Sequence, residues 1–212
     1  MRSNLQAASQ APSFNLVANG KSSGEAFEFQ VFDPTGKLKE VRVPDGLILE
    51  PIERGAAKPV SAGPGQKTSS HKLSAFCVNF EKEPPEPDQL FRVASPEIQE
   101  QYKPVRAVIR AGRELSEAGK FHPDSDPKAY ADSIRQYALW TKLEGWDQQK
   151  FADNFVERTK KNAEALHMKW TQQMESALRN VVPGRWKDIT QVLQRADEIS
   201  QAAGAKQGAG SQ

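Results

Sequence analysis

The chain has 212 residues, 37% of them hydrophobic, and a formal net charge of +2 at pH 7. This length suffices for one large domain or two small ones with a real core, although the mean hydropathy of -0.68 is strongly polar. A charge so close to neutral gives no electrostatic reason to expect binding to nucleic acid or to an anionic membrane surface.

Cysteine and histidine usage excludes further classes. The single cysteine, Cys77, rules out a disulfide framework within the chain and a cysteine-based zinc site. The histidines His71, His122 and His167 are far apart and lack metal-ligand spacing, so we expect no metal and no cofactor. No apolar run approaches the roughly 20 residues of a membrane helix. No signal peptide is visible, so the protein is either cytoplasmic or has lost an export signal before this numbering begins.

The first part of the chain has the pattern of β-structure. Residues 1–13 are rich in Ala, Ser and Gln and are expected to form a disordered leader. Phe27, Phe29 and Val31 then alternate with polar residues, which is the period of a half-buried strand. Turn residues follow this strand, so the segment 25–43 is predicted to be a β-hairpin.

Two more short strands complete the predicted β-module. One is expected at 46–50 and the other at 72–80, where it includes Cys77. Between them, residues 53–70 are rich in Gly, Pro, Ser and Lys and form either a flexible linker or a long loop. Four or more short strands with turn signals between them indicate a sandwich or a partial barrel over residues 14–91.

After Phe91 the hydrophobic period changes from 2 to 3.6, which predicts helices. Pro183-Gly184 is expected to separate the last two of them. The predicted helical segments lie at 99–119, 127–144, from Asp147 to about Leu166, at 168–181 and at 185–202. The fold class is therefore α+β: an antiparallel β-sandwich-like module, followed by an all-α helical module at 92–203 and a disordered tail at 204–212.

Two polar segments of the helical part have structural explanations. The loop 121–127 contains one His and two Asp, but its end at Asp126-Pro127 is typical of a helix N-cap and not of a calcium loop. The basic residues of 147–182 alternate with acidic ones, which is typical of a solvated helix face with ion pairs. We therefore expect no nucleic-acid partner.

Cys77 is the residue that invites a chemical hypothesis. By default, a lone cysteine in a strand behaves as a small buried hydrophobe. A nucleophilic cysteine needs a partner that favours the thiolate, and no Cys/His/Asn protease signature surrounds Cys77. No acid/base pair, metal cluster or phosphate-binding loop is present elsewhere, so we do not expect an enzyme.

A resemblance gives Cys77 a candidate partner. The strand sequence Phe76-Cys77-Val78 and the helical sequence Gln136-Tyr137-Ala138-Leu139-Trp140 resemble the two signatures of bacterial surface thioester domains. The resemblance implies that Cys77 supplies the sulfur and Gln136 the acyl carbon of an internal thioester. Trp140, one turn beyond Gln136, would then shield the bond from water.

The resemblance also implies a function. Members of this family attach covalently to host surfaces, so we expect a secreted or cell-envelope binding protein, with a protein or a surface polymer as its partner. The alternative is a non-catalytic structural or protein-interaction module in which Cys77 is a buried free thiol.

Overall fold

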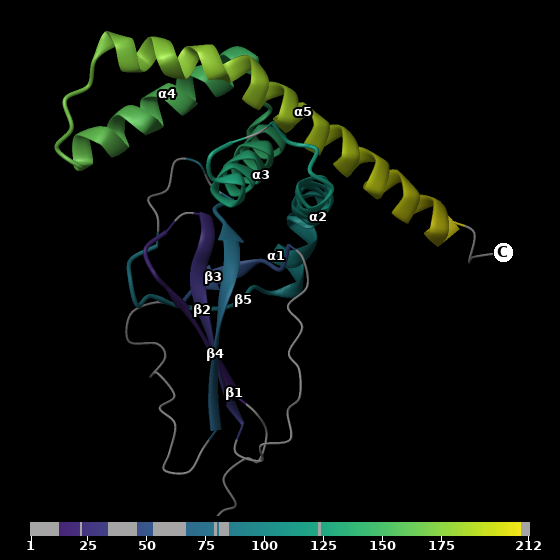
Figure 1. The fold of residues 1–212 in the computed structure, drawn as a ribbon. Helices are drawn as coiled ribbons and strands as arrows, with labels where there is room; N and C mark the ends of the chain where they lie inside the picture. Colours follow the sequence, from purple (N-terminus) through teal and green to yellow (C-terminus); the bar gives the residue numbers. More distant parts are fainter. Residues whose placement is uncertain are drawn as a thin grey trace, which may run out of the picture. The chain divides into compact units, whose positions relative to one another are not determined.

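The computed structural model describes residues 13–21, 23–33, 46–52, 67–78, 80, 85–122 and 124–208. These residues form five β-strands followed by five α-helices (Figure 1). The chain divides into two compact units. The sheet unit is Met1–Phe76 with Glu83–Glu100, and the helical unit is Cys77–Lys82 with Gln101–Gln212. The short stretch that carries Cys77 therefore belongs to the helical unit.

The described strands form one curled antiparallel sheet, a half-barrel (Figure 1). The strands are β1 Ser13–Ala18, β2 Ser23–Asp33, β3 Leu49–Pro51, β4 Lys67–Phe76 and β5 Leu90–Val93. Their order in the sheet is β3-β5-β1-β2-β4, and all neighbours run antiparallel. The predicted α+β class and the antiparallel β-part are confirmed. The predicted sandwich is not, because the described strands all lie in this one sheet.

The alternation seen in the sequence builds the core of the sheet unit. Phe27, Phe29 and Val31 of β2 are all buried, while Glu28 is exposed. Between Glu25 and Phe27 the register with β4 shifts. Such a bulge lets two consecutive residues face inward, and Ala26 is accordingly buried beside Phe27. The buried cluster consists of Leu16, Ala18, Ala26, Phe27, Phe29 and Val31.

The strands differ from the prediction at several points. β4 begins at Lys67, inside the stretch predicted to be a linker or loop, and it ends at Phe76. The prediction that Cys77 lies within a strand at 72–80 is therefore wrong. β5 was not predicted, because it is short and follows a proline-rich segment. The return strand of the predicted hairpin lies outside the described residues.

The described helices are α1 Pro96–Gln101, α2 Lys103–Glu117, α3 Pro127–Glu144, α4 Gln148–Ala165 and α5 Gln172–Gly208. Two of them, α3 and α4, begin at the caps that the sequence predicted. The Asp126 carboxylate accepts a hydrogen bond from the Ala129 N–H at 3.0 Å and caps α3, as predicted. Gly145 ends α3 in the left-handed conformation, with φ of 66°. Asp147 caps α4 in the same way as Asp126 caps α3.

The predicted break at Pro183-Gly184 is wrong, because α5 runs through it as one helix. Proline removes one helical hydrogen bond and costs about 3 kcal/mol in a helix interior. Here α5 packs on α2, α3 and α4, and it buries Val182 before the proline and Ile189 after it. This packing on both sides offsets the lost bond. Residues 204–208, predicted to belong to a disordered tail, are also helical.

The core of the helical unit is aromatic. Trp140, Phe151 and Phe155 are buried, and Tyr137 packs against all three rings at centroid distances of 5.2 to 5.7 Å. Trp186 stacks on Phe151 but is only half-buried. Among the described residues, no helix is both long and apolar enough to cross a membrane.

Candidate functional site

The main chain of Cys77 is paired with the side chain of Gln136. The Cys77 N–H donates to Gln136 Oε1 at 2.8 Å, and Gln136 Nε2 donates to the Cys77 carbonyl at 2.7 Å. Both residues belong to the helical unit. The structure thus brings together the two residues that the sequence resemblance singled out.

This pairing provides hydrogen-bond partners for the main chain of Cys77 beyond the end of the sheet. A strand residue normally bonds both of its main-chain groups to a neighbouring strand. At Cys77, just after the end of β4, the Gln136 carboxamide takes that place. Gln136 is 3% exposed and Cys77 is half-buried. The amide is therefore held in one orientation, next to the Cα atom from which the thiol side chain branches.

Phe80 holds the same stretch of chain at a second point. Its ring lies edge-on against Trp140 at 5.0 Å and against Trp146 at 4.8 Å between centroids. Phe80 follows Cys77 by three positions, and Trp140 follows Gln136 by one helical turn. The two segments thus meet twice, once through hydrogen bonds and once through aromatic rings. Phe80 was not singled out from the sequence.

A guanidinium group lies over these rings. Arg158 of α4 stands 5.0 Å from the centroid of Trp140 and 5.9 Å from that of Phe80. A cation over an aromatic face is attracted by the ring quadrupole. Arg158 therefore helps to hold Phe80 and Trp140 together.

Trp140, the predicted shield, lies in the interior. Its side chain is 1% exposed, and its ring also contacts Trp146 at 6.2 Å. The indole Nε1 is buried and has no hydrogen-bond partner among the described residues. Buried donors are nearly always paired, so an unpaired one calls for an explanation.

The surroundings of Gln136 on α3 are largely buried. Burial raises the pKa of the neighbouring Tyr137 to about 12, although Arg158 and Arg185 oppose that rise. On its other side, Arg135 pairs with Asp132 on the same helix. Burial of this kind is a condition for keeping a thioester from hydrolysis.

A second polar cluster lies at the far end of α3. The buried carboxylate of Asp188 on α5 accepts hydrogen bonds from the Tyr130 hydroxyl and from the His122 N–H, both at 2.9 Å. Its other oxygen lies 2.9 Å from His122 Nδ1. Burial and the Asp188 carboxylate raise the pKa of Tyr130. The cluster fastens the loop before α3 to α5.

Asp188 was not singled out from the sequence, although its position in the sequence is unusual. It occupies the same helical stripe as the buried Val192 and Ala196, so it is a charged residue in an apolar row. The N-cap predicted at the end of the loop before α3 is present at Asp126, and Asp124 accepts a hydrogen bond from the Asp126 N–H at 3.0 Å.

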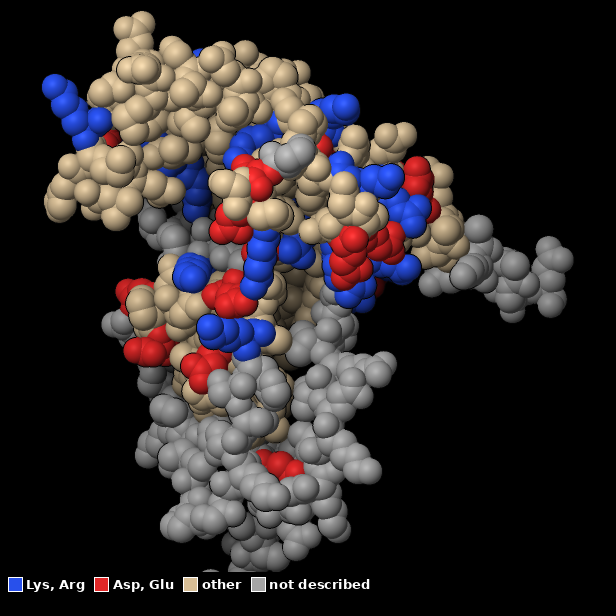
Figure 2. All heavy atoms as spheres, in the orientation of Figure 1, with Lys and Arg blue, Asp and Glu red and all other residues tan. Residues whose placement is uncertain are grey.

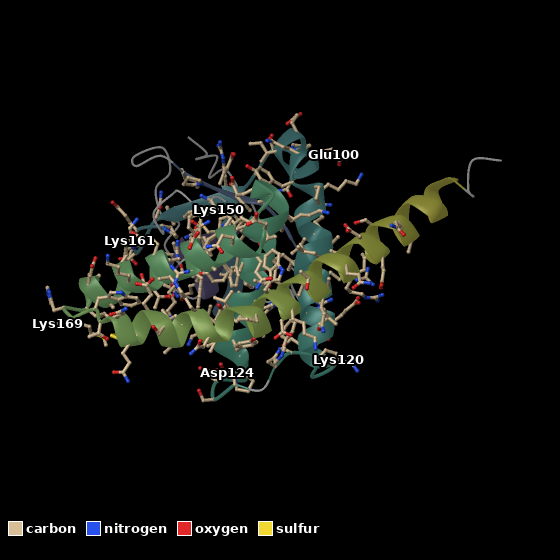
Figure 3. All side chains as sticks on the ribbon, turned by 90° about the horizontal axis from the view of Figure 1, so that it is seen from above. Glu100, Lys120, Asp124, Lys150, Lys161 and Lys169 are labelled. Atoms are coloured by element: carbon tan, nitrogen blue, oxygen red, sulfur yellow. The ribbon has the colours of Figure 1, made fainter. Side chains whose placement is uncertain are left out.

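Basic and acidic side chains lie next to one another on the surface (Figure 2). Lys150, Lys161 and Lys169 point outward from α4 and from the turn that follows it (Figure 3). On α4, Lys161 forms an ion pair with Glu157 at 3.7 Å. Arg195 of α5 pairs with Glu114 of α2 at 2.8 Å. This alternation is the solvated pattern that the sequence predicted.

No protein-family model, curated protein or solved structure matches this chain.

Proposed function

We propose that this chain is a secreted or cell-envelope binding protein that attaches covalently to a protein or surface polymer through an internal thioester between Cys77 and Gln136. The observation that carries the proposal is the reciprocal pairing of the Gln136 carboxamide with the Cys77 main chain, at 2.8 and 2.7 Å. It supports the proposal because it holds the amide carbon beside the residue that bears the thiol. The extracellular setting rests on the resemblance to bacterial surface thioester domains.

Bond formation exchanges the amide nitrogen of Gln136 for the sulfur of Cys77. Cys77 Sγ attacks Gln136 Cδ, the new S–C bond forms, and the C–N bond breaks. The nitrogen leaves as ammonia and takes up the proton of the thiol. Holding the two groups together favours this step, because well-oriented groups within one molecule react at effective concentrations far above those of free solutes.

The resulting thioester is an electrophile at the same carbon. An amine or hydroxyl of the partner attacks Gln136 Cδ and forms an amide or ester, while the C–S bond breaks. The proton of the nucleophile passes to the sulfur, so Cys77 returns to the thiol. Gln136 is 3% exposed, and such burial keeps water away until a partner binds.

The alternative function is a non-catalytic interaction module in which Gln136 serves only to satisfy the main chain. A second glutamine favours this alternative. In the sheet unit, Gln99 makes the same pair of bonds with the main chain of Ile48, at 3.1 and 2.7 Å, and no cysteine is involved. We call this arrangement, in which one glutamine carboxamide bonds both main-chain groups of a distant residue, a glutamine bracket. The chain therefore uses a glutamine bracket for a purely structural purpose elsewhere.

Intact-mass measurement of the native protein distinguishes the two functions. With the thioester, the protein is lighter than its sequence by one ammonia, resists alkylation at Cys77 and takes up methylamine. Cys77→Ala and Gln136→Ala each abolish the mass deficit and the methylamine uptake.

Gln99→Ala is the matched control, because it removes a glutamine bracket that lacks a thiol. It should keep the mass deficit and the methylamine uptake of the wild type. A native protein at full sequence mass, with a freely alkylated Cys77, would leave the interaction module as the function.

A further inference from the structure

The proposed thioester chemistry places negative charge on one atom. In bond formation and in opening by a partner, the attacked atom is Gln136 Cδ, so the tetrahedral intermediate carries its charge on Oε1. Groups that donate hydrogen bonds to such an oxyanion, in a site from which water is excluded, lower the barrier of both steps.

One donor already lies in place. The Cys77 N–H is 2.8 Å from Gln136 Oε1, within the 2.7–3.1 Å range of effective oxyanion donors. Being a main-chain group, it cannot rotate away as a side chain could, and the second bond to the Cys77 carbonyl fixes its alignment. When ammonia leaves, this second bond is lost while the bond to Oε1 remains.

The buried Trp140 Nε1–H is the candidate for a second donor. It has no hydrogen-bond partner among the described residues, and Trp140 lies one turn beyond Gln136 on α3. Contacts with Phe80, Tyr137 and Trp146 hold the ring in place. The buried hydroxyl of Thr141 also lacks a partner within the described part of the chain, but the helical repeat turns position 141 away from Gln136.

We infer that Trp140 Nε1–H and Cys77 N–H form an oxyanion-stabilising pair for acyl transfer at Gln136 Cδ. This inference rests on the proposed function, and it gives Trp140 a chemical role in addition to shielding. The indole donor is left unpaired in the resting amide and is engaged when Oε1 gains charge and moves out of the amide plane. Catalytic hydrogen bonds are often long in the resting state and tighten only in the transition state.

The test replaces Trp140 with residues that keep a flat ring but lack the N–H. Trp140→Phe is the simple variant, and benzothienylalanine at position 140 keeps the full bicyclic shape if phenylalanine packs poorly. Thioester formation after refolding is followed by intact mass, and opening is followed by methylamine uptake. Because both steps share the oxyanion, both should slow by roughly 100-fold, which is the loss typical of one missing donor.

Trp186→Phe is the control, since Trp186 belongs to the same unit but stacks on Phe151. It should keep both rates. Wild-type rates of thioester formation and of methylamine uptake in both Trp140 variants would reduce Trp140 to a packing and shielding residue and overturn the inference. Failure of the proposed function itself looks different: the wild-type protein would then have full mass and take up no methylamine.

Discussion

The carboxamide of Gln136 forms a two-bond ring with the main chain of Cys77, and the thiol takes no part in that ring. The structural role of Gln136 can therefore be measured without the proposed chemistry. In a Cys77→Ala background no thioester can form, yet both main-chain bonds remain available.

In that background, Gln136→Ala is expected to lower the free energy of unfolding by about 1–3 kcal/mol, because it leaves the N–H and C=O of residue 77 unpaired. Urea denaturation measures the difference. Gln149→Ala is the control: Gln149 is an exposed α4 residue that bonds Asp153 at 3.0 Å, and its loss should change stability by less than about 0.5 kcal/mol. Equal losses of stability in the two variants would show that the two hydrogen bonds between Gln136 and the main chain of residue 77 do not stabilise the fold.

Asp188→Ala is expected to lower the free energy of unfolding by more than the loss of an exposed ion pair does. Asp188 is 1% exposed and accepts hydrogen bonds from Tyr130 and His122, so its removal leaves the buried Tyr130 hydroxyl unpaired. We expect a loss of about 2–4 kcal/mol in the free energy of unfolding. Asp197→Ala on the same helix breaks only the exposed pair with Lys142 and should cost about 0–1 kcal/mol. Chemical denaturation of both variants tests the difference.

The buried phenol of Tyr137 should make stability fall at alkaline pH. Its pKa rises from the ordinary value of 10.0 to about 12, chiefly because of burial. Below pH 10 the phenol is neutral in the folded and unfolded chains, so its ionisation does not reduce the free energy of unfolding. Between pH 10 and pH 12 the unfolded chain loses the proton first, so stability falls by at most about 1.4 kcal/mol per pH unit.

Tyr137→Phe removes this titration. Its stability, measured by urea denaturation at a series of pH values, should fall less steeply than that of the wild type over the same range. If stability fell equally with pH in the two proteins, the pKa of Tyr137 would not be raised by its burial.

Pro183→Ala should stabilise the protein. Pro183 is exposed in the interior of α5, where alanine restores the missing N–H and the helix keeps its packing. The expected gain is about 1–3 kcal/mol, read from thermal or urea unfolding. Pro127→Ala is the contrasting variant, because Pro127 stands in the first turn of α3, where proline is favourable. It should give no gain, and an equal gain at both positions would point to a general effect of removing proline.

Local signals were sufficient for part of this structure. The bounds of α3 follow from Asp126-Pro127 at one end and Gly145 at the other, because capping acts within one turn. The inward faces of Phe27, Phe29 and Val31 follow from a period of two. These features depend only on residues close in sequence.

The features that were wrongly predicted from the sequence depend on contacts between residues far apart in the chain. The continuity of α5 through Pro183 comes from packing on three other helices, which outweighs a local preference. At Cys77, after the end of β4, the main-chain hydrogen bonds go to the Gln136 side chain, which is 59 positions away. Motif resemblance paired these two residues, but it could not show that the contact runs through the main chain of Cys77 and not through its thiol.

The helical unit includes one short piece, Cys77–Lys82, from a part of the chain that precedes all of its described helices. During synthesis at about 5–20 residues per second, the 59 positions between Cys77 and Gln136 take roughly 3–12 s to appear. For that time the nascent thiol has no carboxamide beside it and is open to oxidants and to other thiols. The pairing can begin only when α3 has left the ribosome, so a pause after residue 82 would lengthen the exposure of Cys77 without altering the finished fold.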